Sequence, residues 1–170
     1  MKKIKIVLFI AGNGGHKTQI ERILDHMGNN DLDKKEIKKI IFYEKGYKFC
    51  EDALREYEFL PLRDKYSYVK TLKNLISTIC KQIRICLLLN REYEIKGIIS
   101  TGPGIVIFPS FIFKLLNKKI IFIETWSRFY SKSITGRIMY KIADKFYIQN
   151  EELKQKYPKA IYGGRLWKYL

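Results

Sequence analysis

Three short polar segments contain the residues best suited to chemistry, and each follows an apolar run of strand length. The first is Gly12-Asn13-Gly14-Gly15-His16. Glycines let the backbone turn tightly, and a helix that follows such a loop presents free N–H groups and the positive end of its dipole. This combination favours a phosphate or diphosphate. His16 adds a side chain that can hydrogen-bond a phosphate or act as a general base.

The first segment also permits two other interpretations. A glycine-rich turn between a strand and a helix can be purely structural. It can also be a dinucleotide-binding loop, although the G-x-G-x-x-G pattern would need a glycine where Lys17 stands. Glu44, at the end of the second apolar run, is a candidate ribose-binding acid, farther along the chain than usual. A stand-alone nucleotide-binding or NAD-binding module therefore stays open as an alternative.

The second and third segments are Ser100-Thr101-Gly102-Pro103-Gly104 and Glu124-Thr125-Trp126-Ser127-Arg128. Turn chemistry alone can explain Gly-Pro-Gly, but small residues before a helix also suit an anion. Glu124 is suited to accept a sugar hydroxyl or its proton, and Arg128 to pair with a phosphate. An ordinary salt-bridged loop is the alternative. Clustered metal ligands are missing from the sequence, so no metal or other cofactor is expected.

The elements that must position these segments alternate along the chain. Apolar runs of strand length lie at 4–11, 37–43, 95–100, 120–123 and 146–149, with a weaker one at 58–62 that Pro61 interrupts. Several of them lack polar alternation, which suits strands buried on both faces. Helical patterns lie at 18–27, 47–57, 68–90, 105–116, 134–143 and 150–157, and 29–35 reads as a polar turn. The order predicts one α/β domain over 1–170, a Rossmann-like doubly wound, mostly parallel sheet. Its carboxyl edge would bring the three segments together.

The net charge of the chain and its pattern of apolar residues limit the classes of binding partner. The 33 Lys+Arg against 17 Asp+Glu give a net charge of +16, which suits nucleic acid, an anionic membrane or phosphorylated ligands, or a merely solvated basic surface. Nucleic acid is the less favoured of these, because no recognition-helix signature or zinc spacing occurs. The stretch 68–91 combines an apolar face with basic residues suited to a membrane surface, Lys70, Lys73, Lys81, Arg84 and Arg91. It equally suits a helix that only covers the sheet. No signal peptide or transmembrane run is visible, so we expect a soluble or peripheral protein.

Three stretches carry a family resemblance. They are "GNGGHKTQIERIL", "STGPGIVIFP" and "IFIETWSRFYSKSITGRIMYKIADKFYIQNEELKQKYPKAIYGG". They resemble the family of the membrane-recruiting subunit of the eukaryotic dolichol-linked UDP-N-acetylglucosamine transferase (ALG-type). They look closest to its bacterial relatives in capsule and exopolysaccharide synthesis, the PssD type. Residues 45–92 match least.

The resemblance implies the N-terminal half of a GT-B glycosyltransferase, which binds an acceptor linked to a polyprenyl diphosphate. A separate companion subunit would carry the UDP-sugar site. It also implies a peripheral protein at the cytoplasmic face of the plasma membrane, where undecaprenyl diphosphate carries the growing saccharide. Because the apolar runs suffice for one lobe and a GT-B site lies between two lobes, we expect sugar transfer only in the complex.

The same resemblance assigns roles to individual positions. His16 is the implied base for the acceptor hydroxyl. The residues implied to bind the acceptor or its diphosphate, or to line the cleft, are Gly14, Gly15, Gly102, Gly104, Glu124 and Arg128.

Overall fold

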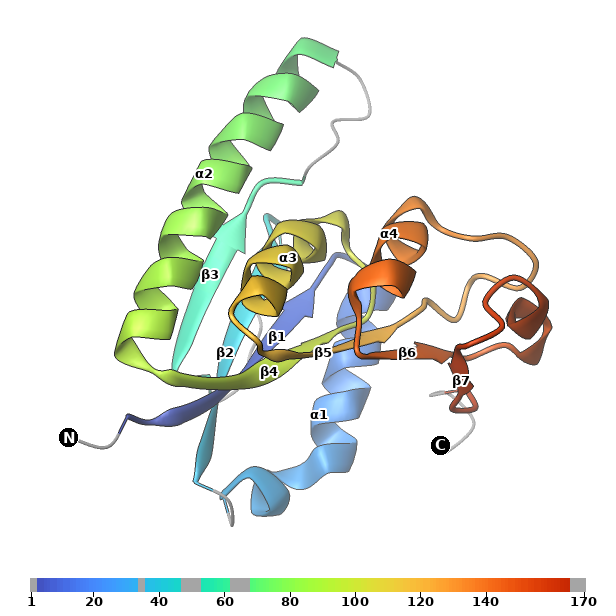
Figure 1. The fold of residues 1–170 in the computed structure, drawn as a ribbon, viewed down its shortest axis with the longest axis horizontal. Coiled ribbons are helices and arrows are strands. Elements are labelled where there is room, and N and C mark those ends of the chain that lie inside the picture. Colours follow the sequence, from blue (N-terminus) through green and yellow to red (C-terminus); the bar gives the residue numbers. More distant parts are fainter. Residues whose placement is uncertain (1–2, 34–35, 47–52, 62–67, 166–170) are drawn as a thin grey trace.

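The apolar runs form the centre of a parallel sheet in the computed structural model, which describes residues 3–33, 36–46, 53–61 and 68–165 (Figure 1). The strands are β1 (Lys5–Ala11), β2 (Ile37–Glu44), β3 (Arg55–Phe59), β4 (Glu94–Ser100), β5 (Lys119–Ile123), β6 (Lys145–Ile148) and β7 (Ile161–Tyr162). The helices are α1 (Gly15–Asp33), α2 (Tyr68–Glu92), α3 (Ile107–Leu115) and α4 (Ile134–Ile142), with short 3-10 helices η1 (Gly104–Val106) and η2 (Glu151–Gln155).

The seven strands are ordered β3-β2-β1-β4-β5-β6-β7, and every neighbouring pair is parallel. The chain runs outward from β1 in one direction through β2 and β3, then returns to the other side of β1 with β4. Ligands of open α/β sheets bind at such a reversal, beyond the carboxyl ends of the strands. The predicted doubly wound, Rossmann-like architecture is confirmed.

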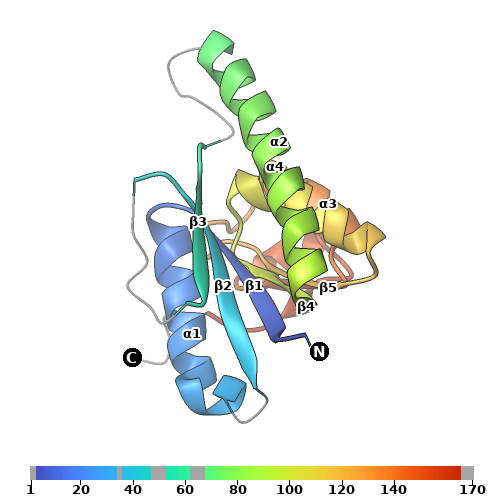
Figure 2. The same cartoon turned by 90° about the vertical axis from the view of Figure 1, so that its left-hand side faces the viewer.

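The two faces of the sheet are covered unequally. Figure 2 shows α1 on one face and α2, α3 and α4 together on the other. Because side chains alternate along a strand, Ile40 and Phe42 of β2 enter the larger core under the three helices, while Ile41 enters the smaller core under α1. In the three-helix layer, α3 contacts both α2 and α4. The central strand β1 therefore faces helices on both sides, as its lack of polar alternation predicted.

The predicted helix at 47–57 is wrong where the structure describes it, because 55–57 belong to β3; 47–52 lie outside the described residues. Arg55–Phe59 pairs with Ile40–Glu44 of β2. The rings of Tyr57 and Phe59 pack on Phe42, with centroids 5.5 and 4.9 Å away. Pairing with β2 and ring packing thus override the local pattern. The weaker strand predicted at 58–62 contains only the last two residues of β3.

Two other predicted segments and one short strand differ from the predictions. The polar turn expected at 29–35 is helical through Asp33, with 34–35 outside the described residues, because the helix established upstream extends at little further cost. The helix expected at 150–157 is only the 3-10 helix η2, since Pro158 disfavours helical backbone at the residue before it. Strand β7 was not predicted, and its two residues are too few to show a period.

Candidate functional site

The three polar segments lie against one another at the carboxyl edge of the sheet. A β-carbon built on Gly12 would lie 2.7 Å from the Cβ of Pro103. One on Gly15 would lie 3.5 Å from Nε1 of Trp126, and one on Gly102 only 3.0 Å from Cε1 of His16. Glycine is therefore needed at 12 and 102 for close approach between the loops. The predicted convergence of the segments is what the structure shows.

His16 is held in one orientation by the second segment. Its Nδ1 lies 2.7 Å from the carbonyl oxygen of Thr101, and Oγ1 of Thr101 donates to the carbonyl of His16 at 2.9 Å. Because a carbonyl oxygen can only accept, Nδ1 carries the proton and Nε2 keeps its lone pair. The contact between the first two loops thus selects the tautomer with a basic Nε2.

Burial also favours the neutral form of this imidazole. Desolvation lowers the pKa of His16 below its ordinary value, and the hydrogen bond to Thr101 and the negative charge of Glu124 offset only part of that effect. A neutral imidazole with one free nitrogen is the form that takes a proton from a hydroxyl. The geometry and the pKa of His16 therefore both suit a general base at neutral pH.

The glycines around His16 open the edge to a ligand. Gly14 has a φ of +59°, and its carbonyl accepts hydrogen bonds from the N–H groups of Lys17 and Thr18 at 3.0 and 3.2 Å. Gly14 and Gly15 are exposed at the start of α1, where helix N–H groups and the dipole favour an anion. Gly104 begins η1, and its carbonyl accepts a hydrogen bond from the N–H of Ile107.

Glu124 lies at the same edge but beneath its surface, with only 1% of the residue exposed. Both of its carboxylate oxygens accept from Oγ of Ser133 at 3.0 Å. The hydroxyl of Tyr157 donates to Oε2 at 3.0 Å, and the N–H of Thr125 donates to Oε1 at 3.1 Å. Ser133 in turn caps α4 by accepting from the N–H of Gly136 at 2.8 Å. The visible task of Glu124 is to hold the start of α4, and its acceptor-binding role stays a prediction.

Arg128, in contrast, is exposed. Its Nη1 donates to Oγ of Ser131 at 3.1 Å. Its loop is fixed by Asn150, whose Nδ2 donates to the carbonyls of Trp126, at 2.8 Å, and of Arg128. A cation held in this way is suited to a phosphate at the same edge.

Two buried glutamines were missed by the sequence reasoning. Gln149 donates to Oε1 of Gln19 at 2.7 Å and to the carbonyl of Glu124 at 3.0 Å. Gln19 donates to Oγ1 of Thr125 at 3.3 Å and so ties α1 to the third segment. Gln149 directly follows β6, so the rule that selected the three polar segments, polar residues after a buried strand, applies to it too.

Glu44 also lies beside the glycine loop. A β-carbon on Gly12 would lie 3.4 Å from its Oε2. Burial raises the pKa of Glu44, and a hydrogen bond from the backbone N–H of Asn13 offsets part of that rise. Within the described residues, no group of three or more His, Cys, Asp or Glu side chains is arranged to hold a metal ion.

Comparisons with known proteins now give the family. Residues 7–166 match the family described as "Oligosaccharide biosynthesis protein Alg14 like". The chain belongs to this family. Among curated relatives, UDP-N-acetylglucosamine transferase subunit ALG14 of Saccharomyces cerevisiae is 26% identical, with 97% of this chain and 78% of the relative covered. The human protein of the same name is 24% identical over 94% of this chain and 82% of its own length. The predicted resemblance to an ALG-type subunit is therefore confirmed.

Solved structures support the fold. MurG of Acinetobacter baumannii, a GT-B protein, aligns with a TM-score of 0.60 at 10% identity, over 85% of this chain and 40% of MurG. A protein described as a putative UDP-N-acetylglucosamine 2-epimerase from Listeria monocytogenes aligns with a TM-score of 0.63 at 11% identity, over 93% and 42%. The chain thus spans about two fifths of each of these proteins, and at this identity the likeness concerns the fold alone.

Proposed function

We propose that this chain is the acceptor-binding subunit of a glycosyltransferase that builds a lipid-linked saccharide. A separate subunit holds the UDP-sugar, and transfer takes place only when the two are joined. Membership of the Alg14-like family supports the division, since relatives are named as subunits of a UDP-N-acetylglucosamine transferase. The observation that carries the proposal is His16: a partly buried, neutral imidazole with a free Nε2 among glycine loops at the carboxyl edge.

The proposed reaction is an inverting displacement. A hydroxyl of the acceptor lies beside Nε2 of His16, which takes its proton as the hydroxyl oxygen bonds to the anomeric carbon. The bond from that carbon to the UDP oxygen breaks, and UDP leaves on the partner. Gly14, Gly15 and the start of α1 face the acceptor's diphosphate, with the loop of Gly102 and Gly104 opposite. Arg128 at the rim adds a charge-assisted contact to a phosphate.

The proposed setting is bacterial capsule or exopolysaccharide synthesis at the cytoplasmic face of the plasma membrane, with undecaprenyl diphosphate as the carrier. The protein would bind there peripherally; no described helix is long and apolar enough to span a bilayer. Helix α2 supports membrane contact, because it buries Cys86 and Leu89 against the sheet while its outer side exposes Ile76, Ile83, Leu87, Leu88, Arg84 and Arg91. Lys81 instead turns toward β3, where it donates to the carbonyl of Glu58. The side chains of Lys70 and Lys73 lie outside the described residues.

Co-expression with the companion subunit tests the proposal. Membranes that contain the chain alone, the companion alone or both would be assayed for transfer of labelled sugar from a panel of UDP-sugars to endogenous lipid-linked acceptor. Transfer is expected only when both subunits are present. Robust transfer by this chain without a companion would contradict the division of labour.

A nucleotide-binding module is the second candidate, and the position of Glu44 beside the glycine loop favours it. It predicts that the chain alone binds NAD or a free nucleotide, and that Glu44→Gln weakens this binding. Calorimetric titration of the isolated chain with NAD and UDP distinguishes the two functions, because the acceptor-binding function requires neither ligand to bind without the partner.

A further inference from the structure

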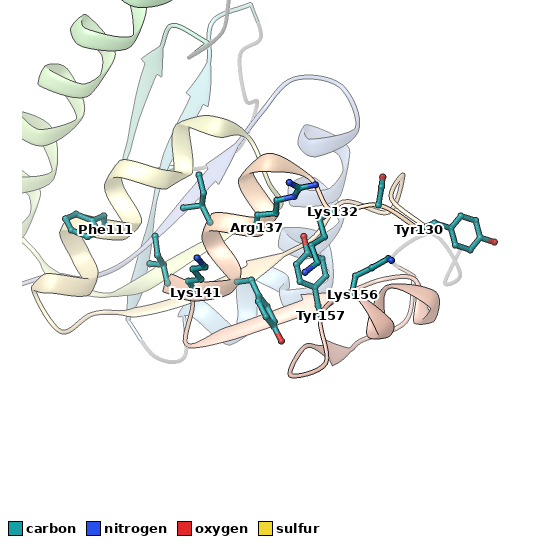
Figure 3. Close-up of a pocket in the computed structure, with 11 residues that line it drawn as sticks. Phe111, Tyr130, Lys132, Arg137, Lys141, Lys156 and Tyr157 are labelled. Carbon is teal, nitrogen blue, oxygen red and sulfur yellow. The ribbon is translucent and has the colours of Figure 1, made fainter.

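A basic groove of about 980 Å³ lies between α3, α4 and η2, beside the end of the loop that follows β5 (Figure 3). Its basic side chains are Lys132, Arg137, Lys141 and Lys156, and its walls include the rings of Tyr140 and Tyr157. None of the eleven lining residues is acidic. His16, the loop glycines and Arg128 do not line this groove. The groove nevertheless adjoins the candidate site, because Ser131 accepts from Arg128 and Tyr157 donates to Glu124.

The four cations of the groove are not held in ion pairs with carboxylates among the described residues. Arg137 and Lys141 are four residues apart, so they lie on one side of α4. Lys132 comes from the preceding loop, with its Nζ 5.1 Å from the ring centre of Tyr157, and Lys156 follows η2. None of these four cations has a carboxylate oxygen within 4.0 Å of its charged nitrogens in the part of the chain that the structure describes. A concave surface with cations of one sign concentrates an attractive potential for anions.

Apolar side chains surround the same groove. Phe111 and Leu115 of α3 are 54% and 69% exposed, and Tyr130 and Ile134, before and at the start of α4, are 74% and 72% exposed. Phe111 and Tyr130 line the two ends of the groove in Figure 3. A small soluble anion would leave these side chains in water, whereas a bilayer surface would bury them and stabilise the contact by roughly 25 cal/mol per Å² of apolar surface removed from water.

We propose that this groove binds the phosphate headgroups of anionic phospholipids, with Phe111, Leu115 and Ile134 entering the interfacial layer of the bilayer. The proposal rests on the peripheral membrane association in the proposed function and assigns it to specific residues. Because α2, α3 and α4 form one layer on one face of the sheet, the exposed outer side of α2 contacts the same membrane surface (Figure 2). The groove then fixes which way the protein sits on that surface.

Vesicle co-sedimentation of the full chain tests this assignment. The partition coefficient would be measured with vesicles of phosphatidylcholine alone and with added phosphatidylglycerol. The test variant is Lys141→Gln/Lys156→Gln. The matched control is Lys119→Gln/Lys145→Gln: both lysines are exposed, and in β5 and β6 they alternate with Ile120 and Phe146 of the three-helix core, so they lie on the α1 side.

We expect the groove variant to lose roughly 30-fold in partitioning to anionic vesicles, since each cation near such a surface contributes about 1 kcal/mol. The control variant should lose less than about 3-fold, because its lysines face away from the membrane. Equal losses in the two variants would overturn the groove as a site, and equal binding of the wild-type chain to neutral and anionic vesicles would overturn the anionic lipid. Unchanged circular-dichroism melting curves confirm that both variants are folded.

Two further measurements separate a lipid surface from other anions. Ile134→Ser removes an exposed apolar side chain, and the proposal expects weaker vesicle binding; an unchanged partition coefficient would overturn insertion at the rim. Millimolar glycerol phosphate should not release the protein from vesicles, and full release would identify a site for soluble anions instead. Vesicle binding needs neither companion subunit nor sugar, so its failure is distinguishable from a failure of the transfer assay.

Discussion

The carboxyl edge of the sheet and the outer surface of the three-helix layer are built in opposite ways. At the edge, polar groups are fixed by partners: Thr101 orients His16, and Ser133 and Tyr157 hold the buried Glu124. The sequences of α3 and α4 contain no Asp or Glu, and the only acid in α2 is Glu92, while apolar and basic side chains are exposed along the layer. Fixed geometry suits a reaction, and a broad basic and apolar surface suits adhesion.

Helix α1 differs from the three-helix layer in its content of acidic residues. It covers the opposite face of the same sheet, yet it contains four acidic residues among its nineteen. The shortage of acids is therefore a property of one face rather than of the whole basic chain. The difference predicts that substitutions at the edge alter transfer without altering vesicle binding, whereas substitutions in the groove weaken vesicle binding.

The largest expected effect separates the two regions. His16→Ala removes the proposed base, and transfer by the two-subunit complex should fall by about 10²- to 10⁴-fold in kcat. The exposed His26 of the same helix is the matched control, and His26→Ala should keep its activity. Vesicle binding should stay unchanged in both variants. Full activity of His16→Ala would remove the base from the mechanism.

The second prediction concerns Gly136, where the two regions meet at the start of α4. A methyl group there would lie 1.9 Å from Oε2 of Glu124 and 2.7 Å from Oγ of Ser133. Gly136→Ala must displace this network, so we expect the free energy of unfolding to fall by about 3 kcal/mol in urea titrations. In Gly163→Ala the nearest atom, Cδ1 of Tyr147, is 3.5 Å away, and a loss within about 0.5 kcal/mol is expected. Similar losses at the two positions would contradict the crowding.

A smaller effect is expected from one hydroxyl. Tyr157→Phe removes the donor to Oε2 of Glu124 inside a buried cluster, and the free energy of unfolding should fall by about 1–2 kcal/mol. Burial and the charge of Glu124 raise the pKa of Tyr157, so the hydroxyl stays protonated and keeps donating at neutral pH. The control is Tyr162→Phe on the exposed β7, with an expected change near zero. Denaturant curves that coincide for Tyr157→Phe and wild type would show that the bond adds nothing.

The smallest expected effect is a pH dependence. The pKa of His16 is lower in the folded chain than in the unfolded one, where it is about 6.5. As pH falls through that value, the unfolded chain binds a proton first, so the folded state loses stability. Between pH 8 and pH 5 the wild-type chain should lose more unfolding free energy than His16→Asn does. If the free energy of unfolding of the wild type and of His16→Asn changed with pH in parallel, the lowered pKa of His16 would be refuted.

The elements that could be predicted from the sequence are those defined by a local pattern or buried on both faces. β1 was visible as a continuous apolar run, because a strand covered on both faces needs no polar alternation. β3 was hidden because its sequence, REYEF, mixes charged and aromatic residues, and only pairing with β2 makes it a strand. The rule that the carboxyl ends of parallel strands share one edge of the sheet was enough to predict that the three polar segments lie together.

The details of the site depend on contacts that no local pattern contains. The carbonyl that fixes the tautomer of His16 lies 85 positions away along the chain. Glu124 was predicted to line the cleft, but its burial depends on Ser133 and Tyr157, 9 and 33 positions away. The groove could not be predicted from the sequence, because its cations come from three different parts of the chain and show no common period. They are Lys132, Arg137, Lys141 and Lys156.

The central place of β1 in the sheet has a consequence for biosynthesis. Lys5 of β1 pairs with Glu94 of β4. The strand that is synthesised first therefore cannot form this pairing until the fourth strand has been synthesised. At about 5–20 residues per second, a ribosome needs roughly 5 to 20 s to make the intervening stretch. During that interval one edge of β1 has no neighbour, and the loop of His16 has no Thr101 to fix its ring. The basic Nε2 therefore becomes oriented only after the chain has closed its longest crossover, which couples the chemistry of this edge to the completion of the sheet.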